Sequence, residues 1–287
     1  MSDILFDDNA TATAVFDEAS LTASPAILLC DDGRVLAATF PTESAYGSLH
    51  VLTDVNSLGG TIGGVWKRRG MSIHSGQSKD SSFAKHAAMD GSGQKVVVSG
   101  DGIMSMYEWS NKNGNESSWE LTSEYDESPE PEYGSLALSK DGTTIAIGSY
   151  KGRDTVDGSG ELYILNDVWP WFNYNDEHPW FIENGEDGPD YDHQSAGRIQ
   201  VSLSSKGDSV LVGRQHKSSN DEQTKTSLQV YHFDVANTEW VSRGLPFGSQ
   251  VHESTTYPYQ SQQIDISDDG TKVANVILGK VFVYEYE

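Results

Sequence analysis

The sequence predicts an all-β fold, and three observations lead to this prediction. Short runs in which apolar and polar residues alternate recur along the whole chain, as expected of half-buried strands. Five of these runs are each followed by a polar turn that ends in glycine and then by a second run rich in β-branched residues. Hydrophobic residues make up 36% of the chain, and with 28 glycines this composition is that of a globular protein with a core.

The strand-turn-strand pattern predicts five β-hairpins. A glycine stands at the turn position of each one, where a positive φ angle favours a residue without a Cβ atom. The hairpins are AILLCDDGRVLAAT (26–39), HAAMDGSGQKVVVS (86–99), SLALSKDGTTIAIG (135–148), QVSLSSKGDSVLVG (200–213) and QIDISDDGTKVANV (263–276). The turn glycines are Gly33, Gly93, Gly142, Gly207 and Gly270.

Each repeat continues with a third run that ends in aromatic residues, and in four repeats a fourth short run around an aromatic residue follows. The third runs are residues 47–53, 102–109, 160–166, 227–233 and 279–286, and the fourth runs are residues 65–70, 118–124, 179–185 and 239–244. Four strands per repeat form the blade of a β-propeller. The sequence therefore predicts a five-bladed β-propeller of four-stranded antiparallel blades.

The fifth repeat stops at Glu287, directly after its third run, and the N-terminal segment TAVFDEAS (13–20) offers the missing strand. Phe16 stands there where the other repeats have tryptophan. We expect this strand to pair into the C-terminal blade and close the ring, because closure leaves no free sheet edge. The predicted organisation is a single domain, 1–287, with an N-terminal arm at 1–24 and blades at approximately 25–70, 83–125, 134–185, 197–244 and 260–287 with 13–20.

The first strand of every repeat alternates in the same phase. Two positions are always apolar, and the positions between them are mostly small or polar. Since side chains alternate between the two faces of a strand, we expect the apolar set to pack between blades and the other set to line a central channel. The apolar set is Ile27, Leu29, Ala87, Met89, Leu136, Leu138, Val201, Leu203, Ile264 and Ile266.

The run SLALSKDGTTIAIGSYKGRDTVDGSGELYIL (135–165) resembles a known propeller repeat of the form S-x-DG-x-x-hydrophobic-A-hydrophobic-GS. That repeat recurs in proteins of aquatic single-celled eukaryotes and some of their large viruses, and it is distantly similar to WD-repeat and FG-GAP propellers. Segments 197–233 and 261–286 match it less fully, and the two N-terminal units match only at the hairpin. The Trp-Asp pairs of WD repeats and the calcium loop of FG-GAP repeats are absent. The resemblance implies a ring scaffold used mostly for binding, and it carries over no catalytic residues.

Charge and cysteine content exclude several function classes. The 19 Lys and Arg against 43 Asp and Glu give a net charge of −24, which argues against binding to nucleic acids or anionic membranes. The single cysteine, Cys30, forms no internal disulfide. The N-terminus lacks a signal-peptide pattern, and no run approaches 18 apolar residues. We expect no membrane insertion and a location in the cytoplasm or within an intracellular or viral assembly.

The inner strands offer little for catalysis. Glycoside hydrolysis needs two carboxylates across the scissile bond, but Asp265 is the one acidic residue among the inner positions and His86 the one other titratable group. We therefore predict that the protein is not an enzyme and takes no cofactor. Calcium is a further candidate ligand, because Asp154, Asp157 and Glu161 lie in one oxygen-rich loop. The alternative is that these acids belong to an ordinary solvated loop, which we favour, so no metal site is predicted.

Two features suggest a partner-binding surface. The connection 166–185 is dense in aromatic residues, which anchor interfaces, and a smaller cluster precedes the last repeat. These aromatic candidates are Trp169, Trp171, Phe172, Tyr174, Tyr257 and Tyr259. The alternative is that the rings fold back over the blade edge. Lys67, Arg68 and Arg69 form the one basic run, either a docking point for an acidic partner or another copy, or a charged edge strand.

Together these observations favour a non-catalytic propeller scaffold that binds protein partners within a larger assembly, such as a viral particle or an organellar complex. A carbohydrate-binding propeller is the first alternative. A glycoside hydrolase with Asp265 as an acid is the second.

Overall fold

The structure is a computed structural model, and it describes residues 26–40, 47–55, 66–74, 83–100, 103–112, 116–126, 133–149, 162–166, 180–183, 199–217, 223–237, 239–253, 263–277 and 280–285. The chain divides into two compact units, Met1–Glu124 and Tyr125–Glu287. Among the described residues, no helix has the length and apolar character needed to cross a membrane.

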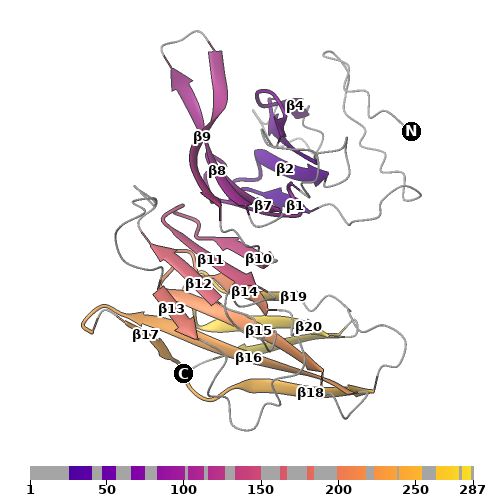
Figure 1. The fold of residues 1–287 in the computed structure, drawn as a ribbon, viewed down its shortest axis with the longest axis vertical. Coiled ribbons are helices and arrows are strands. Elements are labelled where there is room, and N and C mark those ends of the chain that lie inside the picture. Colours follow the sequence, from indigo (N-terminus) through magenta and orange to yellow (C-terminus); the bar gives the residue numbers. More distant parts are fainter. Residues whose placement is uncertain are drawn as a thin grey trace. The chain divides into compact units, whose positions relative to one another are not determined.

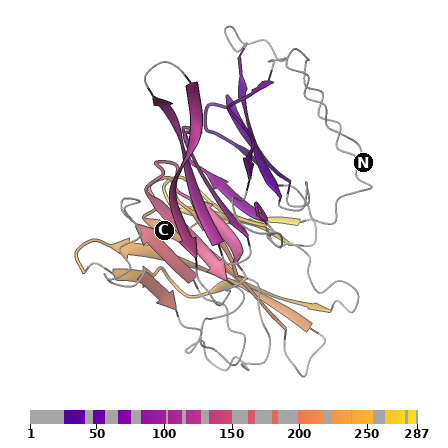
Figure 2. The same cartoon turned by 45° about the horizontal axis from the view of Figure 1, so that its top comes forward.

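The first unit contains two antiparallel sheets (Figure 1). The first sheet has the strand order β1-β2-β3-β4, with β5 paired to β3, and the second sheet has the order β6-β7-β8-β9. The first sheet consists of β1 (Ile27–Leu29), β2 (Val35–Phe40), β3 (Ser48–Asp54), β4 (Trp66–Arg68) and β5 (Ile73–His74). The second sheet consists of β6 (His86–Met89), β7 (Lys95–Gly100), β8 (Ile103–Lys112) and β9 (Glu116–Asp126). Figure 2 shows β8 and β9 as a long twisted pair.

The second unit contains three antiparallel sheets. The third sheet consists of β10 (Tyr133–Leu138), β11 (Thr144–Ser149), β12 (Leu162–Asn166) and β13 (Trp180–Glu183), in that order. The fourth sheet consists of β14 (Ile199–Leu203), β15 (Ser209–Lys217), β16 (Gln223–Asp234) and β17 (Glu239–Ser242), with β18 (Phe247–Glu253) paired to β16. The fifth sheet consists of β19 (Gln263–Ile266), β20 (Lys272–Ile277) and β21 (Lys280–Glu285).

The predicted all-β fold and its five hairpins are confirmed. Each hairpin joins the first two strands of one sheet, and all five turn glycines have φ angles between 67° and 70°. The third strands of all five sheets and the fourth strands of the first four overlap the predicted runs, and β3, β8, β9 and β16 extend beyond them. Strands β5 and β18 are additional to the prediction. Residues 13–20 lie outside the described part of the chain, so the proposed ring closure stays a prediction.

The five turns share one hydrogen-bond pattern. The residue that opens the turn accepts, through its side chain, the backbone N–H of the residue five positions later, and the backbones of the two residues are also bonded. The polar side chain at this position accepts a hydrogen bond in place of the backbone hydrogen bonds between strands that the turn interrupts. The pairs are Cys30 with Val35, Asp90 with Lys95, Ser139 with Thr144, Ser204 with Ser209, and Ser267 with Lys272.

Turns of successive sheets are bonded to each other. Asp31 N donates to Gly91 O at 2.9 Å in the first unit. In the second unit, Lys140 N donates to Ser205 O at 3.0 Å, and Ser205 N donates to Asp268 O at 3.1 Å. Each donor stands one position after the turn-opening residue of its own hairpin. Neighbouring hairpins are therefore aligned at their turns.

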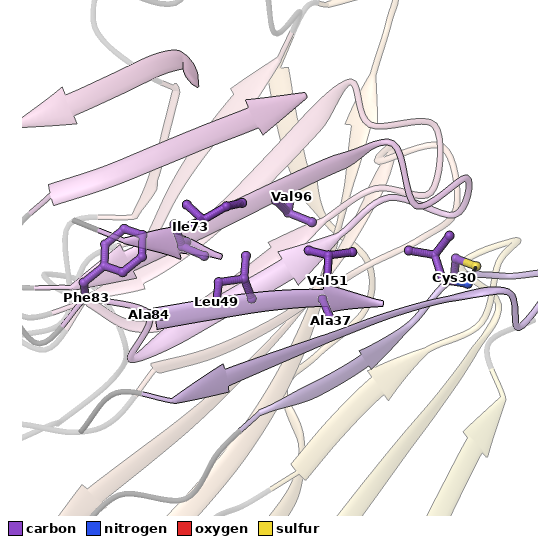
Figure 3. Packing of buried hydrophobic residues seen from close by; sticks show 10 residues of the cluster. Cys30, Ala37, Leu49, Val51, Ile73, Phe83, Ala84 and Val96 are labelled. Carbon is purple, nitrogen blue, oxygen red and sulfur yellow. Dashed lines mark hydrogen bonds between the residues drawn. The ribbon is translucent and has the colours of Figure 1, made fainter. Parts of the chain in front are cut away.

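Within each unit, successive sheets pack face to face around apolar cores. In the first unit, Leu49 and Val51 of the first sheet share one core with Val96 and Val98 of the second. Figure 3 shows Leu49, Val51 and Val96 in this core. In the second unit, one core joins the third and fourth sheets and another joins the fourth and fifth. The core of the third and fourth sheets contains Ala146, Leu162, Ile164, Ile199, Val201, Val210, Val212 and Tyr231, and that of the fourth and fifth contains Leu211, Leu228, Val230, Ile266 and Val273.

The predicted roles of the first-strand faces need correction at two points. Leu28 and Ala137 belong to the set expected to line a channel, but both pack against cores between sheets. Ile27 and Leu29 belong to the apolar set, yet they are 56% and 60% exposed. In the first and third sheets, the face expected to line a channel therefore contributes to sheet-to-sheet packing, and in the first sheet the face with Ile27 and Leu29 is exposed.

Candidate interaction site

Of the residues singled out for partner binding, the structure describes the basic run at the end of β4. Lys67 and Arg68 lie in this strand and are exposed, whereas Arg69 follows it and is half-buried. The remaining candidates for a partner or for calcium lie outside the described residues: Trp169, Trp171, Phe172, Tyr174, Tyr257, Tyr259, Asp154, Asp157 and Glu161.

Arg69 is engaged within the first unit. Its guanidinium carbon lies 4.7 Å from the ring centroid of Trp109 and 5.6 Å from that of Trp119, and Nη1 donates to Gly93 O at 2.8 Å. The indole Nε1 of Trp119 donates to Arg69 O at 2.8 Å. Burial lowers the pKa of Arg69 below its ordinary value, but an arginine stays protonated in proteins. This residue of the basic run therefore joins two sheets, so its cation faces inward.

The second unit repeats this arrangement. Arg243 follows β17 as Arg69 follows β4, and its Nη1 donates to Gly270 O at 3.4 Å. Gly270 is the turn glycine of the following sheet, as Gly93 is for Arg69. The backbone N–H groups also have equivalent partners: Arg69 N donates to Val51 O, and Arg243 N donates to Val230 O.

We call residues 66–71 the first corner and residues 240–245 the second corner. Each begins with tryptophan and ends with arginine, glycine and an apolar residue. Gly70 and Gly244 have φ angles of 80° and 74°, which reverse the chain after the arginine. The side chains that follow, Met71 and Leu245, are each 86% exposed. Sequence reasoning missed this equivalence, although the recurrence of Trp-x-x-Arg-Gly-apolar in two repeats contained the signal.

A buried histidine, His50 of β3, lies on the same face of the first sheet as Ile27 and Leu29. His50 Nε2 lies 3.0 Å from Ser48 Oγ, while Nδ1 lies 3.1 Å from Ser72 Oγ and 3.3 Å from Arg68 Nη2. Because arginine can only donate, Nδ1 accepts and the N–H is assigned to Nε2. Ser48 has no exposed surface and His50 is 6% exposed. This Ser–His pair is therefore closed to a substrate in the arrangement observed.

Asp265, the acid considered for glycoside hydrolysis, takes part in contacts within the second unit. Its Oδ1 accepts from Ser202 Oγ at 3.1 Å and from Ile266 N at 2.9 Å. His86, the other inner titratable residue, is half-buried in β6. Within the part of the chain that the structure describes, no group of three His, Cys, Asp or Glu residues is arranged to hold a metal ion.

Comparisons with known proteins identify no family. No protein-family model matches the chain, and no curated protein sequence matches it either. Among solved structures, one match is KlHsv2 with loop 6CD replaced by a Gly-Ser linker, with 8% identity, a TM-score of 0.35, and coverage of 79% of this chain and 72% of that one. Another is a functionally unknown protein from Desulfotomaculum acetoxidans DSM 771, with 10% identity, a TM-score of 0.36, and coverage of 92% and 76%. At these TM-scores, neither likeness supports a conclusion about this chain.

Proposed function

We propose that the chain is a five-bladed β-propeller that acts as a non-catalytic scaffold and binds protein partners within a larger assembly. The observation that carries the proposal is the repeated mode of sheet-to-sheet attachment. In each described pair of neighbouring sheets within a unit, an apolar core and a backbone bond between turns recur, and Arg69 and Arg243 add the same contact to two of these pairs. Repetition of one mode of attachment from sheet to sheet is what builds a propeller.

Ring closure by residues 13–20 is part of the proposal. The fifth sheet has three strands among the described residues, where the third has four, and β21 is its outer strand. A fourth strand from the N-terminal segment would cover that edge. The first and fifth sheets also carry exposed apolar side chains, Ile27 and Leu29 on β1 and Val281 and Val283 on β21. Closure of the ring would bury these two pairs of side chains.

The turn glycines provide a test of closure. A Cβ added at Gly93 would lie 2.7 Å from Val35 Cβ, and one added at Gly270 would lie 2.6 Å from Ser209 Oγ. In both cases the neighbour stands two positions after the turn glycine of the preceding sheet. A Cβ added at Gly33 meets nothing within 4 Å among the described residues. In a closed ring, Lys272 of the fifth sheet would lie beside Gly33, just as Val35 of the first sheet lies beside Gly93.

The experiment compares the free energies of unfolding of Gly33→Ala and Gly93→Ala. An alanine at positive φ alone costs about 1–2 kcal/mol, and overpacking against a neighbour adds about 1–3 kcal/mol. A closed ring predicts equally large losses for both variants. A loss at Gly33 no larger than the φ penalty, with a clearly larger loss at Gly93, would contradict closure.

The scaffold role is tested by the size of the particle in which the protein occurs. Gentle native fractionation of the source material, followed by mass spectrometry, is expected to find the chain well above its own mass of 31.4 kDa together with defined neighbours. Replacement of Trp169 and Trp171 by alanine is expected to weaken that association if the aromatic connection is an interface. Migration as a free monomer under all gentle conditions would remove the scaffold proposal.

A further inference from the structure

The first corner presents an apolar anchor on a fixed backbone. Met71 directly follows Gly70, and the preceding Arg69 is held through its backbone N–H, its carbonyl and its guanidinium. A single exposed apolar side chain is ordinary on a protein surface. Here the equivalent position of the second corner, Leu245, has the same exposure of 86%. Two repeats thus expose an apolar side chain to solvent at the same position. Because the adjacent backbone is already held in place, a partner that binds there would lose little conformational entropy.

The first corner differs from the second in its charge. Lys67 and Arg68 are exposed, and the equivalent residues of the second corner are Val241 and Ser242. The side chain of Lys67 makes no hydrogen bond or ion pair with the described part of the chain. In a chain with a net charge of −24, this corner is a local cationic spot beside an exposed apolar residue.

The first corner also lies at the edge of a sheet. β4 ends the strand order of the first sheet, and its residues pair with β3 through Leu52, Thr53 and Asp54. Consecutive strand residues point to opposite faces, so Lys67 and Arg68 flank the outer edge of β4 on its two sides. An extended peptide segment that paired with this edge would have Lys67 on one of its faces and Arg68 on the other.

From these observations we propose that the first corner is a docking site for an acidic, extended segment of a partner protein that carries one apolar side chain. The segment lies along the outer edge of β4, its carboxylates face Lys67 and Arg68, and its apolar residue packs on Met71. This inference rests on the proposed scaffold function and names the chemistry of one partner contact. The acidic remainder of the chain repels such a segment, but the Debye length of about 8 Å at physiological salt confines that repulsion to short range.

The test uses the full chain and an array of twelve-residue peptides. The peptides combine Asp and Glu with one Leu, Met or Phe at each position in turn, and basic and neutral peptides of the same lengths serve as comparison. We expect selective binding of acidic peptides that contain the apolar residue. The best peptide is then labelled with fluorescein and titrated by anisotropy, and we expect weaker binding when the salt concentration is raised well above physiological.

Two variants of the first corner and one of the second complete the experiment. Lys67→Glu is expected to weaken peptide binding about tenfold, since it replaces an attraction by a repulsion. Met71→Ser is expected to weaken it about fivefold through the loss of apolar contact. Leu245→Ser, the matched control in the second corner, is expected to leave the affinity within about twofold. All three side chains are exposed, so folding is expected to be unaffected.

Several outcomes would overturn this proposal. It fails if the bound peptides are basic or neutral, if Lys67→Glu binds as well as the unmodified chain, or if Leu245→Ser loses as much affinity as Met71→Ser. Concentration-dependent self-association that Lys67→Glu abolishes, measured by sedimentation, would identify a second copy as the occupant and contradict a separate partner. Absence of peptide binding together with a large native particle would remove the docking site and leave the scaffold function standing.

Discussion

The guanidinium of Arg69 stacks on the indole of Trp109, with 4.7 Å between the guanidinium carbon and the ring centroid. Arg69 follows the fourth strand of one repeat and Trp109 lies in the third strand of the next. The two rings of Trp109 and Trp119 are themselves 5.4 Å apart, so the cation rests beside a pair of aromatic side chains. One arginine thereby connects β4 to β8, β9 and the turn at Gly93.

Replacement of Arg69 by alanine should destabilise the first unit. The variant loses a charged hydrogen bond to Gly93 O and a half-buried cation–π contact, which together contribute about 2–4 kcal/mol. Chemical denaturation followed by tryptophan fluorescence measures the loss. Lys67→Ala is the control, and because Lys67 is exposed its effect is expected to stay within about 0.5 kcal/mol. Equal effects of the two substitutions would contradict the structural role of Arg69.

The thiol of Cys30 should resist alkylation in the folded protein. Its side chain is 4% exposed, Sγ donates to Asp32 Oδ1 at 2.9 Å, and burial raises its pKa above the ordinary value of 9.0. Since the thiolate is the reactive form, both the raised pKa and the burial slow the reaction. Labelling with iodoacetamide at mildly alkaline pH, with and without denaturant, measures this protection, and rapid labelling without denaturant would contradict the buried position.

Serine should replace Cys30 with little loss of stability. Ser139, Ser204 and Ser267 open the turns of three of the other four hairpins, in the role that Cys30 has in the first. A hydroxyl at position 30 can likewise accept the N–H of Val35 and donate to Asp32. We expect the free energy of unfolding to change by less than about 1 kcal/mol. Cys30→Ala, which cannot accept the N–H, is expected to be less stable than Cys30→Ser, and the reverse order would refute the shared turn design.

Asp269 should contribute to the acid dependence of stability. Hydrogen bonds from Ser267 Oγ and from the backbone and hydroxyl of Thr271 lower its pKa from 3.8 to about 2. Because the folded pKa lies below the unfolded one, the stabilisation is complete above the unfolded value of 3.8 and is lost as the pH falls through about 2. Asp269→Asn should therefore melt at a lower temperature than the unmodified chain at neutral pH, and the difference should vanish near pH 2. A difference that does not depend on pH would show that the charge is irrelevant.

Features governed by neighbours in the chain were predictable. The five turn glycines, their positive φ angles and the hairpin strands follow from residues within one turn of each other, so a single sequence contains the whole cause. The position of the fourth strand was also predictable in the first four repeats, because each of these strands contains a tryptophan. Strands β5 and β18 occur in one repeat each, so no recurring pattern predicts them, and each pairs with the first residues of a third strand.

The candidate site was predicted only in part. The sequence indicated that Lys67, Arg68 and Arg69 form a basic run, but their uses differ because of partners far away in the chain. Arg69 binds Trp119, which stands 50 residues later, and Arg68 contacts His50. The aromatic candidates of connection 166–185 remain predictions, and the loop of Asp154, Asp157 and Glu161, for which we favour an ordinary solvated loop, stays untested, because both lie outside the described residues.

By itself the sequence determined the all-β class, the hairpin repeat and the backbone conformation at each turn, because these depend on residues a few positions apart. Only the tertiary structure decided which side chains pack between the sheets and which face solvent. Arg69 is held between aromatic rings, whereas Met71, two residues later, is 86% exposed. Burial of this kind depends on the neighbouring sheet, and no local sequence pattern specifies which residues of that sheet will contact the side chain.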